Sequence, residues 1–515
     1  MVTASNTSLD MQEVLLQNLQ QAQLFPHTVD RFTLLQTHIS WVLLTGPYAY
    51  KFKKPVNLGF LDFSTLALRK HFCEEELRLN QQLAPDLYLE VIAITGSPAH
   101  PELNGKGQAI EYAVKMQQFP QSAQLDEVLA NAELKAEHID RLAETVAEFH
   151  DRTKRATSDT TYGLPQQVWQ PVAENFQHIR NSIDQNLFEQ RLNTLQNWCQ
   201  AQFDQLVDVF QQRKLQGYVR EGHGDMHLRN MALLDKKVVL FDCLEFNPSL
   251  RWIDVINDVA FLIMDLDDRG QSPLAWRFLN RYLELTGDYA GIRLLNFYKV
   301  YRALVRAKVD AIRLGQAHLS REEQNTTQQD FMAYLELTES YTRKASPVLI
   351  LTRGVSGTGK TTYTQSLLET MGAIRIRSDV ERKRLYKQNR DLYSHETTQQ
   401  VYRYLALLAG DLLRSGYRVI VDATFIDSRQ ITLFHQLAHQ MDIPFHILEF
   451  TAKPDTLRNR IRQRKQDYSD ATINVLEQQL QQWQTLSDDV KVYLIQLDTE
   501  QPIDLIQLAN TLSKS

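Results

Sequence analysis

The sequence predicts two domains: an α+β domain in which a small β-rich lobe precedes a larger helical lobe, and an α/β domain with a parallel sheet. Strand-like runs dominate the chain up to about residue 119, and helical periodicity dominates from there to residue 345. From residue 346 to 515, strands alternate with helices, which is typical of a parallel sheet. A chain of 515 residues also exceeds the ~250–300 residues at which a single hydrophobic core stops growing.

Residues 1–29 are expected to form a short polar tail and an amphipathic helix, because their apolar residues recur at helical spacing. The runs FTLLQTH, SWVLLTG and YAYKFKKPV follow and are separated by turn residues, which predicts a small antiparallel sheet. A helix is expected over 64–84, with Ser64 as its cap and Pro85 as its stop. LYLEVIAIT and AIEYAVKM predict further strands of the small lobe, which begins at residue 30.

The helical lobe, predicted over residues 120–345, is interrupted once by strand-like text that contains HGDMHLRN, residues 223–230. Phosphoryl transfer needs a carboxylate that orients the acceptor hydroxyl and oxygen ligands for magnesium. Asp225 and Asn230 are five positions apart, which is the Asp-to-Asn spacing of the protein-kinase catalytic loop. Asp242 ends the apolar strand KVVLFD, where a second magnesium ligand is expected. The pattern therefore favours a phosphoryl-transfer loop.

Two other interpretations of HGDMHLRN are weaker. His223 and His227 are zinc-type ligands, but Gly224 between them argues against a helical face, and no third His or Cys is nearby in the sequence. A turn whose polar groups satisfy only the local backbone leaves Asp242 without a role.

A kinase site also needs a cation on the ATP phosphates, held by a carboxylate from a helix. Lys51 and Lys53 lie on one face of the strand YAYKFKKPV, and we select Lys51. Glu76 is its expected partner, although Glu75 is adjacent and the spacing does not choose between them. The alternative is a solvated basic edge strand beside a charged helix face.

Residues 30–340 resemble the aminoglycoside phosphotransferase-like kinases, which share the bilobal protein-kinase-like fold and use an HGDxHxxN loop. FDCLEF stands where protein kinases have DFG, and no GxGxxG loop precedes Lys51, which fits small-molecule kinases better. Similar family members carry an aspartate at the place of Asp258 that supports the catalytic loop. The resemblance implies Asp225 as catalytic base, Asn230 and Asp242 as magnesium ligands, His223 as a structural loop residue, and Lys51 with Glu76 as the ATP-anchoring pair.

The C-terminal domain begins with the strand PVLILTR and the stretch GVSGTGKT, which matches the phosphate-binding loop G-x-x-x-x-G-K-[ST] and opens a helix. Its glycines let backbone amides close around phosphates, Lys360 is expected on the β- and γ-phosphates, and the Thr361 hydroxyl on magnesium. Asp422, which ends RVIVD, is the second expected magnesium ligand. The predicted nucleotide-binding residues are Gly354, Gly357, Thr358, Gly359, Lys360, Thr361 and Thr362.

Other features of this domain favour a kinase among P-loop proteins. It lacks the guanine-reading NKxD and the transporter LSGGQ motifs. The stretch RSDVERKRL places Asp379 and Arg382 after the second strand, where Asp379 can take a proton from an acceptor hydroxyl. Four arginines, at positions 458, 460, 462 and 464, occupy the place of a lid, where they would neutralise charge on the transferring phosphoryl group. An ordinary solvated basic helix is the alternative.

Residues 347–515 resemble the P-loop kinases that include zeta-type toxins, gluconate kinase and phage polynucleotide kinase. The SDxxR element and the R…RQRK…SDA segment carry this likeness. It implies an α/β P-loop NTPase fold, Asp379 as base, Arg382 as a substrate-side contact, and Arg460 and Arg464 as lid residues. The whole chain resembles bacterial fusions of an aminoglycoside phosphotransferase-like domain with such an AAA-type ATP-binding domain.

The composition bears on which partners and which cellular compartment are expected. A net charge of −6 provides no global field for a polyanion. Three widely spaced cysteines fit neither a disulfide framework nor a zinc knuckle, which predicts a reducing cytoplasmic location. No apolar run approaches the ~20 residues that cross a bilayer, so no membrane partner is expected.

These observations predict an ATP- and Mg²⁺-dependent phosphotransferase with two kinase-type sites, each of which phosphorylates a small-molecule hydroxyl. One alternative makes one domain catalytic and the other a regulatory nucleotide-binding module. Another makes the P-loop half a polynucleotide 5′-hydroxyl kinase that uses the arginine-rich segment as a phosphate track. Neither acceptor, nor the oligomeric state, is readable from the sequence.

Overall fold

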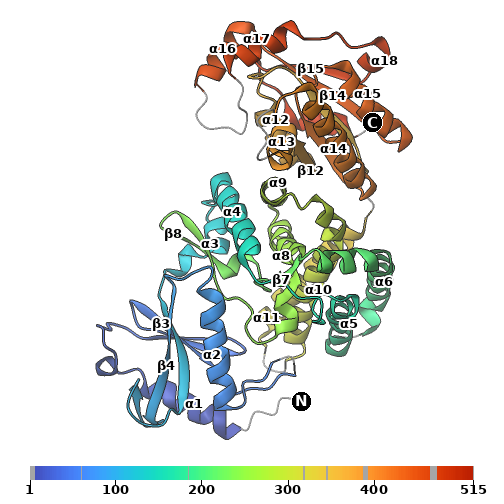
Figure 1. The fold of residues 1–515 in the computed structure, drawn as a ribbon. Coiled ribbons are helices and arrows are strands. Elements are labelled where there is room, and N and C mark those ends of the chain that lie inside the picture. Colours follow the sequence, from blue (N-terminus) through green and yellow to red (C-terminus); the bar gives the residue numbers. More distant parts are fainter. Residues whose placement is uncertain are drawn as a thin grey trace. The chain divides into compact units, whose positions relative to one another are not determined.

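The computed structural model describes residues 6–59, 61–183, 185–316, 319–343, 346–386, 392–463 and 472–513. The chain divides into two compact units, whose elements Figure 1 labels. The first comprises Met1–Pro171 and Val207–Leu262, and the second Val172–Leu206 and Ile263–Ser515. The predicted boundary at residues 345 and 346 stays a prediction, because the second unit joins helices that follow residue 262 to the α/β half of the chain.

A six-stranded antiparallel sheet begins the first unit, in the order β1-β2-β3-β6-β4-β5. Helices α1 (Asn6–Asn18) and α2 (Leu66–Asn80) cover its opposite faces, because Ala113 packs with Leu16 of α1 and the adjacent Val114 packs with Cys73 of α2. The strands are β1 (Thr33–Gln36), β2 (Ser40–Leu44), β3 (Tyr48–Lys53), β4 (Tyr88–Ser97), β5 (His100–Leu103) and β6 (Glu111–Gln117). The antiparallel sheet predicted for this region is confirmed.

The limits of helix α2 differ from the prediction at both ends. The helix begins at Leu66, and the hydroxyl of Thr65, not Ser64, accepts the capping hydrogen bond. It ends at Asn80, ahead of Pro85, because the backbone turns there through hydrogen bonds to the Asn80 carbonyl.

Two short antiparallel ribbons interrupt the helices of the first unit and carry the loop HGDMHLRN. Strand β7 pairs with β10, and β8 pairs with β9. The loop lies between β7 and β8, and Asp242 follows β9. The elements of this region are α3 (Leu125–Ala130), α4 (Ala136–Arg152), β7 (Val219–Glu221), η3 (Leu228–Asn230), β8 (Met231–Leu234), β9 (Lys237–Leu240), α7 (Pro248–Arg251) and β10 (Trp252–Asp254). Three helices have residues in both units: α5 (Pro165–Ser182), α6 (Gln185–Leu215) and α8 (Val255–Asp268).

The second unit combines helices with a five-stranded parallel sheet in the order β12-β13-β11-β14-β15. Every residue of β11 is buried, as expected for a parallel sheet that is covered on both faces. Helices α12 and α19 pack on one face around Ile350 and Leu448. The confirmed fold class is therefore an α+β kinase-like domain followed by an α/β P-loop domain.

The remaining bounds of the second unit are as follows. Its first helices are α9 (Ser272–Thr286), η4 (Tyr289–Leu294), α10 (Leu295–Leu314) and α11 (Arg321–Thr342). The strands are β11 (Leu349–Arg353), β12 (Ala373–Arg377), β13 (Arg418–Asp422), β14 (Phe445–Thr451) and β15 (Leu494–Asp498). The helices between and after them are α12 (Lys360–Met371), α13 (Ser378–Leu385), α14 (His395–Arg414), α15 (Ser428–Gln440), α16 (Pro454–Gln463), α17 (Ile473–Gln481), α18 (Asp488–Lys491) and α19 (Leu505–Ser513).

Candidate active sites

The loop HGDMHLRN of the first unit is held from beneath by Asp258 of helix α8. Its carboxylate accepts the backbone N–H groups of His223 at 2.8 Å and Gly224 at 2.9 Å. Gly224 has a φ of +81°, and a Cβ there would meet the Leu250 carbonyl at 3.0 Å, so this turn requires glycine. The supporting role expected of Asp258 is therefore confirmed.

His223 is a structural residue of this loop. It is fully buried, and burial lowers its pKa, which keeps the imidazole neutral. The Phe241 carbonyl lies 2.9 Å from Nε2 and can only accept, so Nε2 carries the proton, while Nδ1 accepts the N–H of Asp225 at 3.2 Å. Both ring nitrogens are thus used within the protein, which leaves neither for zinc.

Asp225 lies beside the amide of Asn230. Asn230 Nδ2 donates to the Asp225 carbonyl at 3.0 Å and to its Oδ2 at 2.9 Å, so the Asn230 amide oxygen is the atom turned away from this pair. His227 Nε2 lies 3.3 Å from the same carboxylate oxygen. The Asp225 side chain is 40% exposed, which leaves it accessible to an acceptor.

Lys51 of β3 lies between two carboxylates. Its Nζ donates to Glu76 Oε1 at 2.8 Å and to Asp242 Oδ1 at 2.6 Å. Lys53 is buried and donates to the other oxygen of Glu76 at 2.6 Å and to Glu245. Glu75 instead binds Arg78 at 2.8 Å. The sequence left open Lys51 or Lys53, and Glu75 or Glu76. Both lysines bind Glu76, and Lys51 is the one that also binds Asp242.

The ion pairs of this cluster shift the pKa values of its side chains strongly. Burial alone would raise the pKa of Glu76, but the ammonium groups of Lys51 and Lys53 lower it to about 2. Burial would likewise lower the pKa of Lys51, but Asp242 and Glu76 raise it well above its ordinary value. Glu76 and Lys51 are therefore both ionised at neutral pH.

Asp242 has a strained backbone, with a φ of +61°. The hydroxyl of Tyr88 lies 3.2 Å from its N–H, and Asn80 of α2 accepts the next N–H, that of Cys243, at 2.9 Å. Sequence reasoning missed these two supports and Glu245. A polar Asn80 at the buried end of an amphipathic helix is the signal that was available.

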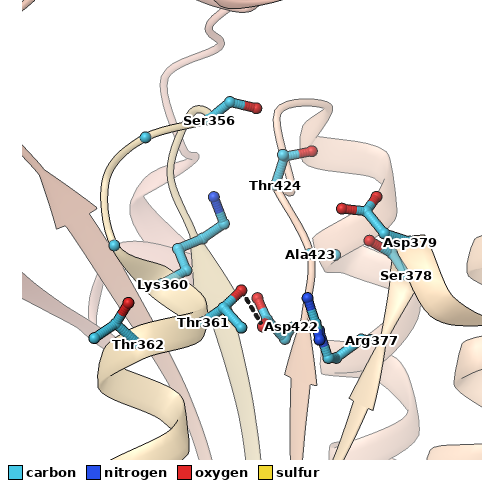
Figure 2. Close-up of a pocket in the computed structure, with 12 residues that line it drawn as sticks. Ser356, Lys360, Thr361, Thr362, Arg377, Ser378, Asp379, Asp422, Ala423 and Thr424 are labelled. Atoms are coloured by element: carbon cyan, nitrogen blue, oxygen red, sulfur yellow. Dashed lines mark hydrogen bonds and ion pairs between the residues drawn. The ribbon is translucent and has the colours of Figure 1, made fainter. Parts of the chain in front are cut away.

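The phosphate-binding loop of the second unit has the conformation that its glycines permit (Figure 2). Gly357 and Gly359 have φ values of +87° and +86°, and a Cβ on Gly354 would meet the Phe450 carbonyl at 2.7 Å. Lys360 Nζ donates to the carbonyls of Gly354 at 2.8 Å and Val355 at 3.0 Å. The loop therefore closes around its own lysine, which extends into the pocket.

Two magnesium-type oxygen donors meet at the base of this pocket. Thr361 Oγ1 donates to Asp422 Oδ2 at 2.9 Å, which Figure 2 marks with a dashed line. Arg377, at the end of β12, pairs in register with Asp422, and its Nε lies 3.9 Å from the same oxygen. The pocket is lined by Ser356, Gly357, Gly359, Lys360, Thr361, Thr362, Arg377, Ser378, Asp379, Asp422, Ala423 and Thr424.

Asp379 lies at the start of α13 and faces this pocket (Figure 2). Burial raises its pKa, and the neighbouring Asp422 carboxylate raises it further, against the opposing effect of Arg377, Lys360 and Arg382. A carboxylate with a raised pKa is a stronger base, which suits proton abstraction from an acceptor hydroxyl.

Neither Arg382 nor Arg460, two of the predicted arginines, lines the pocket. Arg382 is not among the lining residues; it donates to the Leu392 carbonyl at 2.8 Å and its guanidinium lies 5.1 Å from the Tyr393 ring centre. Arg460 donates to the Gly357 carbonyl at 3.3 Å and to the Thr499 hydroxyl at 2.8 Å. It thus joins the phosphate-binding loop to the end of β15.

Arg464 lies outside the described residues, and Thr358 is buried beneath the loop, where its hydroxyl donates to the Val355 carbonyl at 2.8 Å. Sequence reasoning missed five lining residues: Ser356, Arg377, Ser378, Ala423 and Thr424. All but Ser356 lie at the end of β12 or β13 or within two positions after it, at the carboxyl edge of the sheet, which is where ligands bind in parallel sheets.

Comparisons with known proteins agree with the two domain types. A family model described as a phosphotransferase enzyme family matches residues 63–295, and a model described as an AAA domain matches residues 349–486. Uncharacterized proteins of Mycobacterium tuberculosis and Mycobacterium bovis are each 31% identical over 452 residues, which cover 85% of this chain and 88% of the relative. The chain belongs to their family. It is an ATP-dependent kinase that joins a phosphotransferase domain to an AAA-type P-loop domain.

Two solved structures resemble parts of this chain. A choline kinase from Cryptosporidium parvum is 11% identical, with a TM-score of 0.40, and the match covers 65% of this chain and 96% of that chain. A gluconokinase from Sinorhizobium meliloti is 16% identical, with a TM-score of 0.25, and the match covers 33% and 91% of the two chains.

Two features are absent from the described residues: a membrane-spanning helix and a cluster of metal-binding side chains. No helix among them is long and apolar enough to span a membrane. In the same part of the chain, no three His, Cys, Asp or Glu side chains gather in a way that would hold a metal ion. The zinc interpretation of His223 and His227 therefore has no third ligand in the described part of the chain.

Proposed function

We propose that this kinase has two separate sites, each of which transfers the γ-phosphate of ATP to a hydroxyl of a small molecule. One observation carries the proposal: in each half a lysine, a candidate base carboxylate and oxygen donors suited to magnesium lie on neighbouring segments. In the first half, Lys51 binds Asp242 and Asn230 binds Asp225, and the N–H of Phe241, next to Asp242, donates to the Asn230 carbonyl at 3.0 Å. In the second half, Lys360, Asp379, Thr361 and Asp422 line one pocket.

In the first site, we propose one task for each residue, and the contacts support it. Glu76 holds Lys51 in position to bind ATP phosphates, and Asp225, oriented by Asn230, accepts the proton of the acceptor hydroxyl. The amide oxygen of Asn230 and the carboxylate of Asp242 would hold Mg²⁺, which prefers such oxygen ligands. When bound, Mg²⁺ supplies charge neutralisation of the phosphates.

In the second site, the loop amides and Lys360 bind phosphates, and Thr361 with Asp422 would hold Mg²⁺. Asp379 accepts the proton of the acceptor hydroxyl. We propose Arg382 as a residue that fixes the acceptor side, through its contacts with the segment that precedes α14. Arg460 and Arg464 are proposed as lid residues, with Arg460 acting through the loop carbonyl that it binds.

The test is a screen of metabolites and oligonucleotides with labelled ATP, using the wild type, Asp225→Ala, Lys360→Ala and the double variant. Two products, each lost with a different single change, support two catalytic sites. A single product that both changes affect, with one variant still binding ATP normally, identifies a regulatory site instead. If the wild type shows no ATP turnover that depends on Asp225 or on Lys360, the proposal is contradicted.

The alternative of a polynucleotide 5′-hydroxyl kinase has its own measurement. Arg458 is committed to Glu477 at 2.8 Å and Asp455 at 3.0 Å, so two carboxylates compete with any phosphate track there. Salt-sensitive binding of short single strands at low ionic strength would favour that alternative. A cytoplasmic location and Mg²⁺ as the cation remain predictions of the sequence.

A further inference from the structure

Strand β12 lies at the edge of the parallel sheet and ends beside the second site. An edge strand exposes a row of unpaired backbone N–H and C=O groups. Here helix α9 covers that edge: Asn280 Oδ1 accepts the N–H of Arg375 at 2.7 Å, and its Nδ2 donates to the Ala373 carbonyl at 2.9 Å. Helix α9 lies within the phosphotransferase match and outside the AAA match, but in the same compact unit as this sheet.

Glu284, one turn after Asn280 on the same face of α9, binds two arginines of β12. Its Oε1 accepts from Arg375 at 2.8 Å, and its Oε2 lies 3.6 Å from the Arg377 guanidinium. The two arginines are two positions apart, so they extend from the same face of the strand. The three side chains are at most 8% exposed, and a buried charge requires such a partner.

Both arginines also contact residues of the second site. Arg375 also donates to the Thr361 carbonyl at 3.1 Å, in the first turn of the helix that carries Lys360. Arg377 lines the pocket and reaches Asp422, the partner of Thr361. Glu284 is therefore one guanidinium away from the proposed magnesium ligands.

A second contact from the same part of the chain holds the helix that carries Asp379. The hydroxyl of Tyr289, in η4, donates to the buried Glu381 of α13 at 3.2 Å, and Arg384 binds the same carboxylate. Residues outside the AAA match thus hold the chain on both sides of Asp379, at Arg377 and at Glu381.

We propose that Glu284 is a positioning residue of the P-loop kinase site, which sets the guanidinium of Arg377 between helix α9 and Asp422. The inference rests on the proposed phosphoryl transfer at that site. Its consequence is that the AAA-matched segment is not a complete functional unit, because a carboxylate from the phosphotransferase-matched segment holds the arginine that reaches Asp422.

The experiment uses the full chain with Asp225→Ala, so that the remaining turnover of ATP, measured with Mg²⁺ present, is Lys360-dependent. In this background, Glu284→Gln is expected to lower kcat about tenfold or more and to leave the Kd for ATP within about twofold, because the phosphate loop keeps its contacts. Glu284→Asp keeps the charge and is expected to restore part of the turnover. Arg277→Gln is the matched control, because the contact of α9 that it breaks is with Glu369 of α12 at 2.8 Å and not with an arginine of β12.

The outcomes separate the two hypotheses. If no turnover in the Asp225→Ala chain depends on Lys360, the proposed function of this site fails. If such turnover exists and Glu284→Gln matches Arg277→Gln, only the positioning role is overturned. An undiminished effect of Glu284→Gln in an Arg377→Gln chain also overturns it. Where Glu284→Gln does not fold, a folded Arg377→Gln variant with unchanged kcat gives the same contradiction, because Arg377 is the group through which Glu284 is proposed to act.

Discussion

The two sites are built in opposite ways. In the first, Lys51 and Asp242 are 191 positions apart and meet through side-chain ion pairs. In the second, Lys360 binds the carbonyls of Gly354 and Val355, six and five positions away. The first site therefore depends on the packing of its whole unit, whereas the phosphate-binding part of the second depends on the backbone of one loop.

The largest effect is expected from removal of a proposed base. Asp225→Asn should lower transfer at the first site by about 10²- to 10⁴-fold, because the amide cannot accept the acceptor proton. Turnover of labelled ATP by Asp225→Asn, compared with Lys360→Ala, measures this. Equal losses of the same product in both variants would contradict two independent sites.

The next effect concerns stability and should occur in the first unit alone. Glu76→Gln leaves Lys51 and Lys53 without their shared carboxylate, and breaking such a buried pair costs about 3–5 kcal/mol. Denaturant unfolding measures the loss. Glu75→Gln is the matched control, since its partner Arg78 is 37% exposed and the expected cost is about 1 kcal/mol or less.

The pH dependence of unfolding gives a check on the same cluster. The pKa of Glu76 is about 2 when folded and near 4.5 ordinarily, so its stabilising contribution is present above pH 4.5 and is lost as the pH falls toward 2. Glu76→Gln should remove this part of the pH dependence. An unchanged acid slope in the variant would show that the ion pairs do not stabilise the unit.

A smaller effect tests the backbone-built site. Gly357→Ala forces an alanine to a φ of +87°, with its Cβ 3.1 Å from the Leu457 carbonyl, so a cost of about 1–2 kcal/mol and weaker ATP binding are expected. Gly46→Ala is the control, because its φ is +95° but nothing lies within 4 Å. Calorimetric ATP binding should change only for Gly357→Ala.

The smallest effect is a shift of a pH profile. The raised pKa of Asp379 means that transfer at the second site is lost, as the pH falls, at a higher pH than an ordinary aspartate would give. Arg382 opposes that rise, so Arg382→Gln should move the acid limb of kcat further upward. Lys360-dependent turnover against pH measures it, and a downward shift would exclude Asp379 as the titrating base.

Local motifs were predictable because one stretch of chain holds both the signal and the geometry. The GVSGTGKT loop has the conformation that its glycine spacing predicts, and HGDMHLRN places Asn230 on Asp225. Choices between neighbours were not predictable. Lys51 and Lys53 lie on one strand face and both reach Glu76, so only the location of Asp242 distinguishes them.

The sequence by itself determined the two domain types, the segments that bear the proposed bases and the order of the strands along the chain. Only the tertiary structure decided that Asp242 meets Lys51, that Arg460 binds the loop carbonyl of Gly357, and that Glu284 reaches β12. The physical reason is range. Backbone conformation follows from adjacent residues, whereas a buried charge obtains its partner from whichever distant element packs against it.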